Sequence, residues 1–102
     1  RMIYSLEVPG PIADVEQIRV LEWHGEVGQQ FELNELIVEL ETHKALVEVR
    51  AGQAGVLREV LAEAGDWKAI GETIAVFSDT SDEDLPQSAV ELSQLAVNFE
   101  VV

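Results

Sequence analysis

The chain has 102 residues, which is enough for one small domain. It contains no cysteine, so disulfide bonds, thiolate metal sites and cysteine nucleophiles are excluded. Six basic and 20 acidic residues give a formal net charge of −14, which argues against nucleic acids and membranes as partners. No apolar run approaches the ~20 residues that span a bilayer, and the first residues lack the apolar segment of a secretory signal.

Short runs rich in valine, isoleucine and leucine, separated by glycine, asparagine and proline, predict an all-β domain. Apolar and polar residues alternate in two of these runs, so that Leu36, Val38 and Leu40 fall on one face. Residues 41–45 lie between these two runs, and they predict a tight hairpin with a polar tip. The strands are expected at residues 3–8, 17–23, 36–40, 46–49, 56–61 and 73–77.

An internal repeat appears when residues 18–41 are aligned with residues 55–78. Asn34 aligns with Gly71, and both residue types tolerate a left-handed backbone at a turn. Two similar halves predict two small antiparallel sheets, related by a pseudo-twofold axis and packed face to face as a flattened barrel. The five identical pairs are Glu22/Glu59, Glu26/Glu63, Gly28/Gly65, Glu35/Glu72 and Ile37/Ile74.

The last part of the chain differs in composition, because residues 79–102 contain six acidic residues and no lysine or arginine. Residues 79–84 are expected to form a solvated acidic linker, and residues 89–102 an apolar appendage that docks on the domain. Within the appendage, Val97, Phe99 and Val101 alternate with polar residues and would add an edge strand. We therefore expect a domain at residues 3–78, followed by the linker and appendage at residues 79–102.

Few residues are suited to catalysis, and we expect neither an active site nor a metal site. The two histidines, His24 and His43, have no evident triad partner or metal-ligand spacing, and His24 is expected in a surface loop. The chain has only two lysines, Lys44 and Lys68. Lys44 falls at the predicted hairpin tip, where it is either a solubilising turn residue or an amine that projects toward a large partner.

The tip sequence, Glu41-Thr42-His43-Lys44-Ala45, resembles the Glu-Thr-Asp-Lys-Ala motif of lipoyl domains, the swinging-arm carriers of 2-oxo acid dehydrogenase complexes. The resemblance covers about residues 3–78. Other family features also have counterparts here, namely the segment Val8-Pro9-Gly10-Pro11, then Trp23, Gly28 and Leu36, residues 48–51, and Gly55, Gly65, Asp66 and Gly71.

The resemblance implies a barrel-sandwich fold in which Lys44 carries lipoate in amide linkage, while Glu41, Thr42, His43 and Ala45 present the lysine to other enzymes. It implies a carrier domain without its own active site, monomeric in isolation and part of a dihydrolipoamide acyltransferase. The implied partners are a lipoate ligase or lipoyl transferase, a thiamine-diphosphate 2-oxo acid decarboxylase, the acyltransferase core and dihydrolipoamide dehydrogenase. The expected compartment is the bacterial cytoplasm or the mitochondrial matrix.

The chain also departs from the family motif, since His43 replaces the usual acidic residue before the lysine. This departure keeps open a second hypothesis, in which the chain is an unmodified binding or structural module on the same fold. Biotin carrier domains share the fold as well, but they have Met-Lys-Met around their lysine, where this chain has His43-Lys44-Ala45. Lipoate is therefore favoured over biotin at Lys44.

Overall fold

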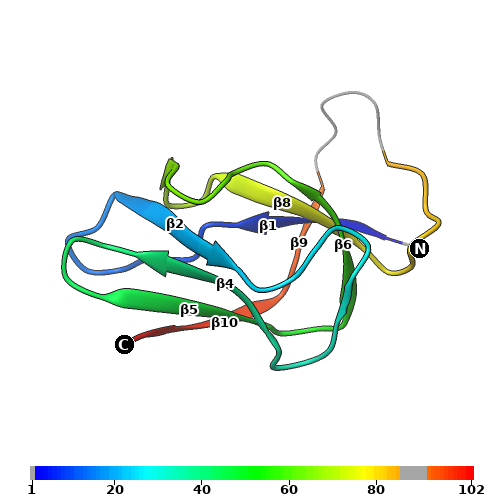
Figure 1. Ribbon diagram of the computed structural model, residues 1–102, viewed down its shortest axis with the longest axis horizontal. Helices are drawn as coiled ribbons and strands as arrows, with labels where there is room; N and C mark the ends of the chain where they lie inside the picture. The colour runs from blue at the N-terminus through cyan, green and yellow to red at the C-terminus, as the bar shows by residue number, and fades with distance from the viewer. Residues whose placement is uncertain (1, 86–91) are drawn as a thin grey trace.

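A computed structural model describes residues 2–85 and 92–102, and its regular elements are all β-strands (Figure 1). The predicted all-β class is confirmed. No helix in these two described ranges is long and apolar enough to cross a membrane. The strands are β1 (Ile3–Glu7), β2 (Gln17–Trp23), β3 (Gln30–Phe31), β4 (Leu36–Glu41), β5 (Leu46–Ala51), β6 (Gly55–Val60), β7 (Trp67–Ala69), β8 (Thr73–Ser78), β9 (Ser93–Gln94) and β10 (Val97–Val101).

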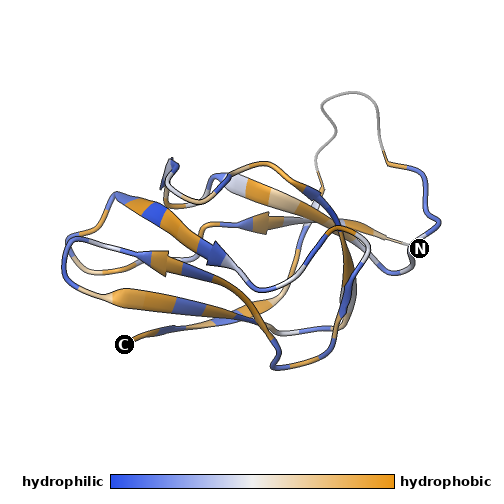
Figure 2. Cartoon of the chain, in the orientation of Figure 1, coloured by the Kyte–Doolittle hydropathy of each residue, from blue (hydrophilic) through white to orange (hydrophobic). Residues whose placement is uncertain are grey.

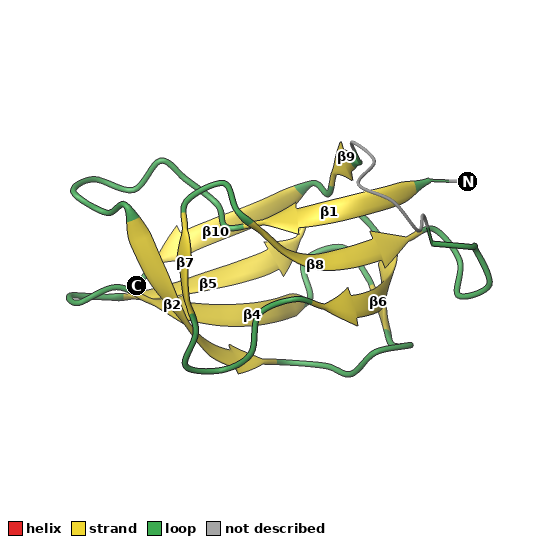
Figure 3. Cartoon of the chain, turned by 90° about the horizontal axis from the view of Figure 1, so that it is seen from above, coloured by secondary structure: helices red, strands yellow, loops and turns green. Residues whose placement is uncertain are grey.

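The strands form two five-stranded sheets, which pack face to face as a flattened sandwich of 39 × 27 × 21 Å (Figure 3). One sheet has the order β3-β6-β8-β1-β9 and the other the order β10-β5-β4-β2-β7. All pairs are antiparallel except β1 with β9. The predicted flattened sandwich is thereby confirmed.

The core lies between the sheets, where buried apolar residues of both sheets pack together. Figure 2 shows hydrophobic residues along the strands of both sheets. Trp23 is half-buried at the edge of this core, and its indole Nε1 donates to the carbonyl oxygen of Ala62 at 2.8 Å. The largest fully buried side chains are Phe31, Phe77, Leu6, Ile18, Ile37, Leu40, Leu57, Ile74, Leu95, Val8, Val20 and Val38.

Reciprocal backbone hydrogen bonds show the predicted pseudo-twofold symmetry directly. The amide of Gly28 donates to the carbonyl of Leu57 at 2.7 Å, and the repeat-equivalent amide of Gly65 donates to the carbonyl of Val20 at 2.8 Å. Both glycines have a left-handed backbone, with φ of 95° and 97°. Each half of the chain therefore closes a turn onto the other half in the same way.

A second pair of turns repeats with the same precision. Asn34 and Gly71 have positive φ angles of 74° and 89°, as their alignment predicts. Just after them, the side chains of Glu35 and Glu72 each accept from the backbone amide three residues earlier, at 2.7 and 3.1 Å. The weak sequence repeat thus marks positions that shape the backbone.

The C-terminal segment adds one strand to each sheet. β9 pairs with β1 and β10 pairs with β5, so the segment crosses from the edge of one sheet to the equivalent edge of the other. Leu95, between them, is only 2% exposed. β10 is the edge strand that the alternation predicts. Residues 86–91, which include the first three residues of the expected appendage, lie outside the described residues.

Candidate functional site

The β4–β5 hairpin is rigid at its tip, because Thr42 bonds across the turn. The backbone amide of Thr42 donates to the carbonyl oxygen of Ala45 at 2.9 Å. The Thr42 hydroxyl oxygen accepts from the amides of Lys44 and Ala45 at 3.1 and 3.0 Å. A hydroxyl that accepts hydrogen bonds from two turn amides holds the backbone of a short turn in place.

Lys44 projects from this turn into solvent. Among the ion pairs of the described residues, none involves Lys44, whereas Lys68 Nζ lies 3.4 Å from a carboxylate oxygen of Glu72. Of the two lysines, Lys44 therefore has its amine available on a fixed backbone, and Lys68 has its amine paired on a strand.

The other predicted site residues lie around the same tip in different roles. The carboxylate of Glu41 accepts from Arg19 Nη1 at 3.2 Å, so it is held against β2 rather than directed at the lysine. Ala45 is half-buried, and His43 is exposed beside Lys44. The structure thus brings all five predicted residues together, with His43 and Lys44 as the pair most open to a partner.

An open groove of about 390 Å³ lies beside the hairpin, and sequence analysis did not predict it. Its walls are the hairpin tip, residues 11–15 of the segment that joins β1 to β2, and Val101 of β10. The backbone of Val15 donates to the carbonyl of Ile12 at 3.1 Å, and Asp14 has a positive φ of 63°, so this segment is a compact turn. Two views place the hairpin, this segment and the C-terminus at one end of the molecule (Figures 1 and 3).

A row of four glutamates crosses the outer face of one sheet from β2 to β10. Glu22 pairs in register with Glu39, Glu39 with Glu48, and Glu48 with Glu100. Like charges directly opposite each other cost stability, and Arg50, whose Nη2 lies 3.7 Å from Glu48 Oε1, offsets part of that cost. The row places negative charge on the same sheet that carries Lys44.

His24 is less isolated than a surface-loop residue, although it lies in the bend after β2 as expected. Its side chain is half-buried, and its Nε2 lies 2.5 Å from a carboxylate oxygen of Glu39. The donor atoms of His24, Glu22 and Glu39 all lie within 4.8 Å of one another. A register shift in β2 between Val20 and Glu22 creates this grouping, and such a shift has no evident signal in the sequence.

Comparison of the sequence with known proteins identifies a family for this chain. The Biotin_lipoyl family model, described as "Biotin-requiring enzyme", matches residues 5–77. The chain belongs to this family. The predicted relationship is confirmed, and the family match covers the sandwich from β1 to β8 while leaving out β9 and β10.

Individual relatives agree with the family match. The chain is 40% identical over 77 residues to the dihydrolipoyllysine-residue succinyltransferase component of the 2-oxoglutarate dehydrogenase complex of Staphylococcus saprophyticus, covering 76% of this chain and 18% of that protein. It is 32% identical over 90 residues to the Bacillus subtilis protein of the same name, covering 88% and 22%.

A mitochondrial relative is the pyruvate dehydrogenase complex protein X component of Saccharomyces cerevisiae, 29% identical over 92 residues and covering 85% of this chain and 22% of that protein. The chain thus spans about a fifth of the length of these curated relatives.

Proposed function

We propose that this chain is a lipoyl carrier domain of a 2-oxo acid dehydrogenase complex, with lipoate in amide linkage to Lys44. Lys44 supports this role because it is exposed, is in no ion pair among the described residues, and lies on a turn that Thr42 fixes, in a chain of the biotin/lipoyl family. The relatives that are dihydrolipoyllysine-residue transferases support lipoate as the group and the acyltransferase component as the parent protein.

The residues of the tip fit an attached lipoyl group. An amide forms only at an amine that an enzyme can reach, and Lys44 projects into solvent while Lys68 is paired with Glu72. When bound, lipoate supplies a disulfide that accepts an acyl group together with two electrons. The chain's own contribution is to hold Lys44 on a rigid tip, which keeps the arm at a high effective concentration near successive active sites.

The charge distribution supports partners with basic surfaces. The net charge of −14 and the row from Glu22 to Glu100 place a negative field on the sheet next to the tip. Such a field steers the domain toward positively charged surfaces and weakens as salt is added. The proposed partners are the lipoylating enzyme, the thiamine-diphosphate decarboxylase, the acyltransferase core and dihydrolipoamide dehydrogenase, in a bacterial cytoplasm or a mitochondrial matrix.

Intact-protein mass spectrometry tests the attachment site. The whole chain is incubated with lipoate, ATP and a lipoate ligase, next to the variants Lys44→Arg and Lys68→Arg. We expect the wild type and Lys68→Arg to gain one lipoyl group each, and Lys44→Arg to gain none, because a guanidinium does not form the amide.

The same measurement distinguishes the alternatives. A wild-type chain that stays unmodified, while a control lipoyl domain is modified, would support the unmodified binding module instead. A mass gain with biotin and a biotin ligase, but none with lipoate, would support a biotin carrier. Equal modification of Lys44→Arg and the wild type would refute the assignment of Lys44.

A further inference from the structure

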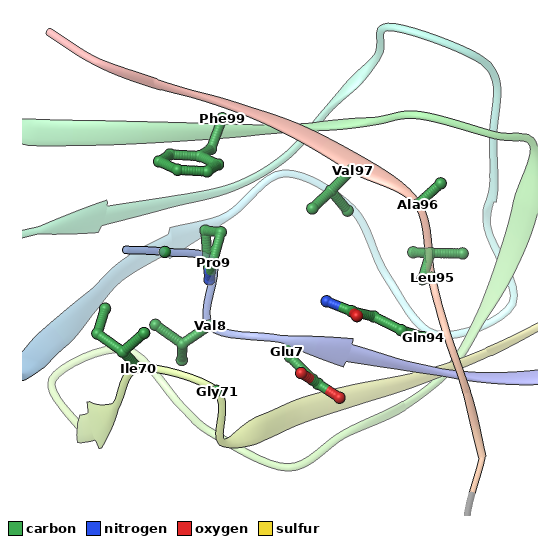
Figure 4. Close-up of a pocket in the computed structure, with 11 residues that line it drawn as sticks. Glu7, Val8, Pro9, Ile70, Gly71, Gln94, Leu95, Ala96, Val97 and Phe99 are labelled. Atoms are coloured by element: carbon green, nitrogen blue, oxygen red, sulfur yellow. The ribbon is translucent and has the colours of Figure 1, made fainter. Parts of the chain in front are cut away.

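A second groove lies next to the one beside Lys44, further along β10 from the hairpin tip. This open groove of about 420 Å³ has Pro9 on one side and Val97 and Phe99 on the other (Figure 4). Gly10 also lines it. The first groove is lined by Pro11 and the residues after it, and by Val101. Along both walls, therefore, the residues that line one groove begin within two positions of where the residues that line the other end.

The β10 wall of these grooves is apolar and open to solvent. Phe99 pairs in register with Val49 and Val101 with Val47, so their side chains point to the side of the sheet that carries the core. Because β10 is an edge strand, the core does not cover them, and Phe99 and Val101 stay 37% and 49% exposed. Figure 4 shows Phe99 and Val97 projecting from β10 toward the groove.

We propose that these two neighbouring grooves together form a resting site for the lipoyl group on Lys44, in which β10 forms one wall and residues 9–15 the other. The inference rests on the proposed function. Lys44 itself lines the first groove, so the occupant is tethered at the entrance. About eleven bonds separate the Lys44 Cα atom from the dithiolane ring, a reach on the order of 12 Å by the span of an extended chain.

That reach matches the length of the wall. Two residues along a strand span roughly 7 Å, so an arm that starts beside Val101 extends past Phe99. An aliphatic chain with an uncharged ring gains by leaving water for apolar surface, and the exposed faces of Ile12, Val101 and Phe99 provide that surface. The resting state exchanges with an extended state that visits partner enzymes, so the groove sets how much of the time the arm is available.

The β10 wall of the proposed resting site is part of the C-terminal segment of this chain. The family match ends at residue 77, before β9 and β10 begin. Three hydrogen bonds to the body of the domain hold the segment in place: Leu95 N to Ser5 O at 2.8 Å, Gly52 N to Ala96 O at 2.8 Å, and Ala96 N to a side-chain oxygen of Gln53 at 2.9 Å.

Nuclear magnetic resonance on the whole chain, with and without enzymatic lipoylation, tests the proposal. Intact mass first establishes that Lys44 is modified. We then expect the methyl signals of Ile12 and Val101 to shift on modification, and we expect nuclear Overhauser contacts between these methyls and the methylene protons of the arm. The methyls of Leu33, which is 58% exposed and lies before β4, at the end of that strand opposite to the Lys44 turn, provide the internal control and should not move.

A chemical measurement adds a second readout. The arm is reduced to the dithiol, and its alkylation by a bulky maleimide is timed in the wild type, in Val101→Ser and in the matched control Leu33→Ser. We expect Val101→Ser to react roughly threefold to tenfold faster than the wild type, because a less apolar wall shifts the population to the extended state. Leu33→Ser should react at the wild-type rate.

The outcomes separate the two proposals. A chain that is modified at Lys44, but shows no methyl shifts and the same alkylation rate in all three proteins, overturns the resting site and leaves the carrier function standing. A chain that is never modified at Lys44 overturns the carrier function, and with it the resting site.

Discussion

The two ends of the sandwich are built from equivalent strands, yet the chain passes through them differently. At one end, β4 runs directly into β5 through the four-residue turn that carries Lys44. At the other end the equivalent strand pair is β8 and β1, and no turn joins them. There, the amide of Met2 donates to a carboxylate oxygen of Asp79 at 3.0 Å, and the amide of Asp79 donates to the Met2 carbonyl at 3.2 Å.

The connections that follow β5 and β1 also differ, in their length. Residues 52–54 join β5 to β6, whereas residues 8–16 join β1 to β2 and fold beside the hairpin. The end with Lys44 therefore has both a closed turn and a longer connecting segment. The repeat therefore supplies a shared scaffold, while the candidate site is built from the two places where the repeat is broken.

The strongest test of the shared scaffold is a pair of equivalent core substitutions. Ile37 and Ile74 occupy the same position in the two halves, and each is fully buried. Truncation to alanine leaves a cavity, so we expect Ile37→Ala and Ile74→Ala each to cost about 2–5 kcal/mol of unfolding free energy. Urea denaturation measures both. Costs that differ by more than a factor of two would break the equivalence of the halves.

Much of this scaffold was predictable because its signals are local. Alternation along β4 and β5, and the left-handed positions at Asn34 and Gly71, depend on residues close together in the chain. The same holds for Lys44, which lies between two clear strands. β3, β7 and β9 have two or three residues each, which is too short for any periodicity to appear.

The groove and the glutamate row were not predictable for a different reason. They depend on contacts between segments far apart in the sequence, such as Val101 beside Ile12, and on a register shift in β2 that brings Glu22 opposite Glu39. One signal was present: the alternation in residues 97–101 predicted the strand, but nothing local indicates which sheet it joins.

The turn that distinguishes the Lys44 end can be weakened without touching the lysine. In Thr42→Val the amides of Lys44 and Ala45 lose their acceptor, so we expect a loss of about 1 kcal/mol in unfolding free energy. Thr42→Ser keeps the hydroxyl and serves as the matched control. Chemical denaturation gives the cost, and amide hydrogen exchange at the tip should accelerate only in the valine variant. Unchanged exchange would show that the hydroxyl does not order the turn.

The opposite end has its own contact, and that contact depends on pH. The Tyr4 hydroxyl donates to a carboxylate oxygen of Asp79 at 2.9 Å. Burial, followed by this hydrogen bond, raises the pKa of Tyr4 above its ordinary value of 10.0. The folded chain thus favours the neutral phenol, so the stabilisation is complete below pH 10.0 and disappears as the pH rises through the folded-state value.

Tyr4→Phe tests this reasoning at the end that lacks the hairpin. We expect the variant to be less stable than the wild type by about 1 kcal/mol or less at neutral pH, since the contact is partly exposed. The difference should shrink in denaturation series run above pH 10.0, because the contribution of the Tyr4 hydroxyl is lost there and the variant never had it. A difference that stays constant into the alkaline range would mean that the ring's packing, and not its hydroxyl, provides the stabilisation.

The smallest expected effect concerns recognition at the tip, where His43 replaces the acidic residue of the family motif. His43 is exposed beside Lys44, and an imidazole, unlike a carboxylate, carries no negative charge. His43→Asp adds one negative charge at the exposed hairpin tip, next to the lysine that a partner must reach. An exposed charge contributes about 1 kcal/mol or less, so we expect the initial rate of lipoylation by a ligase adapted to the acidic motif to rise about twofold. The advantage should shrink as salt is added, because salt screens surface charge.

His43→Asn changes the side chain without adding the charge and should stay near the wild-type rate. If His43→Asp is slower instead, the imidazole itself belongs to the recognition surface, and the hairpin end differs from its symmetric counterpart in chemistry as well as in chain path.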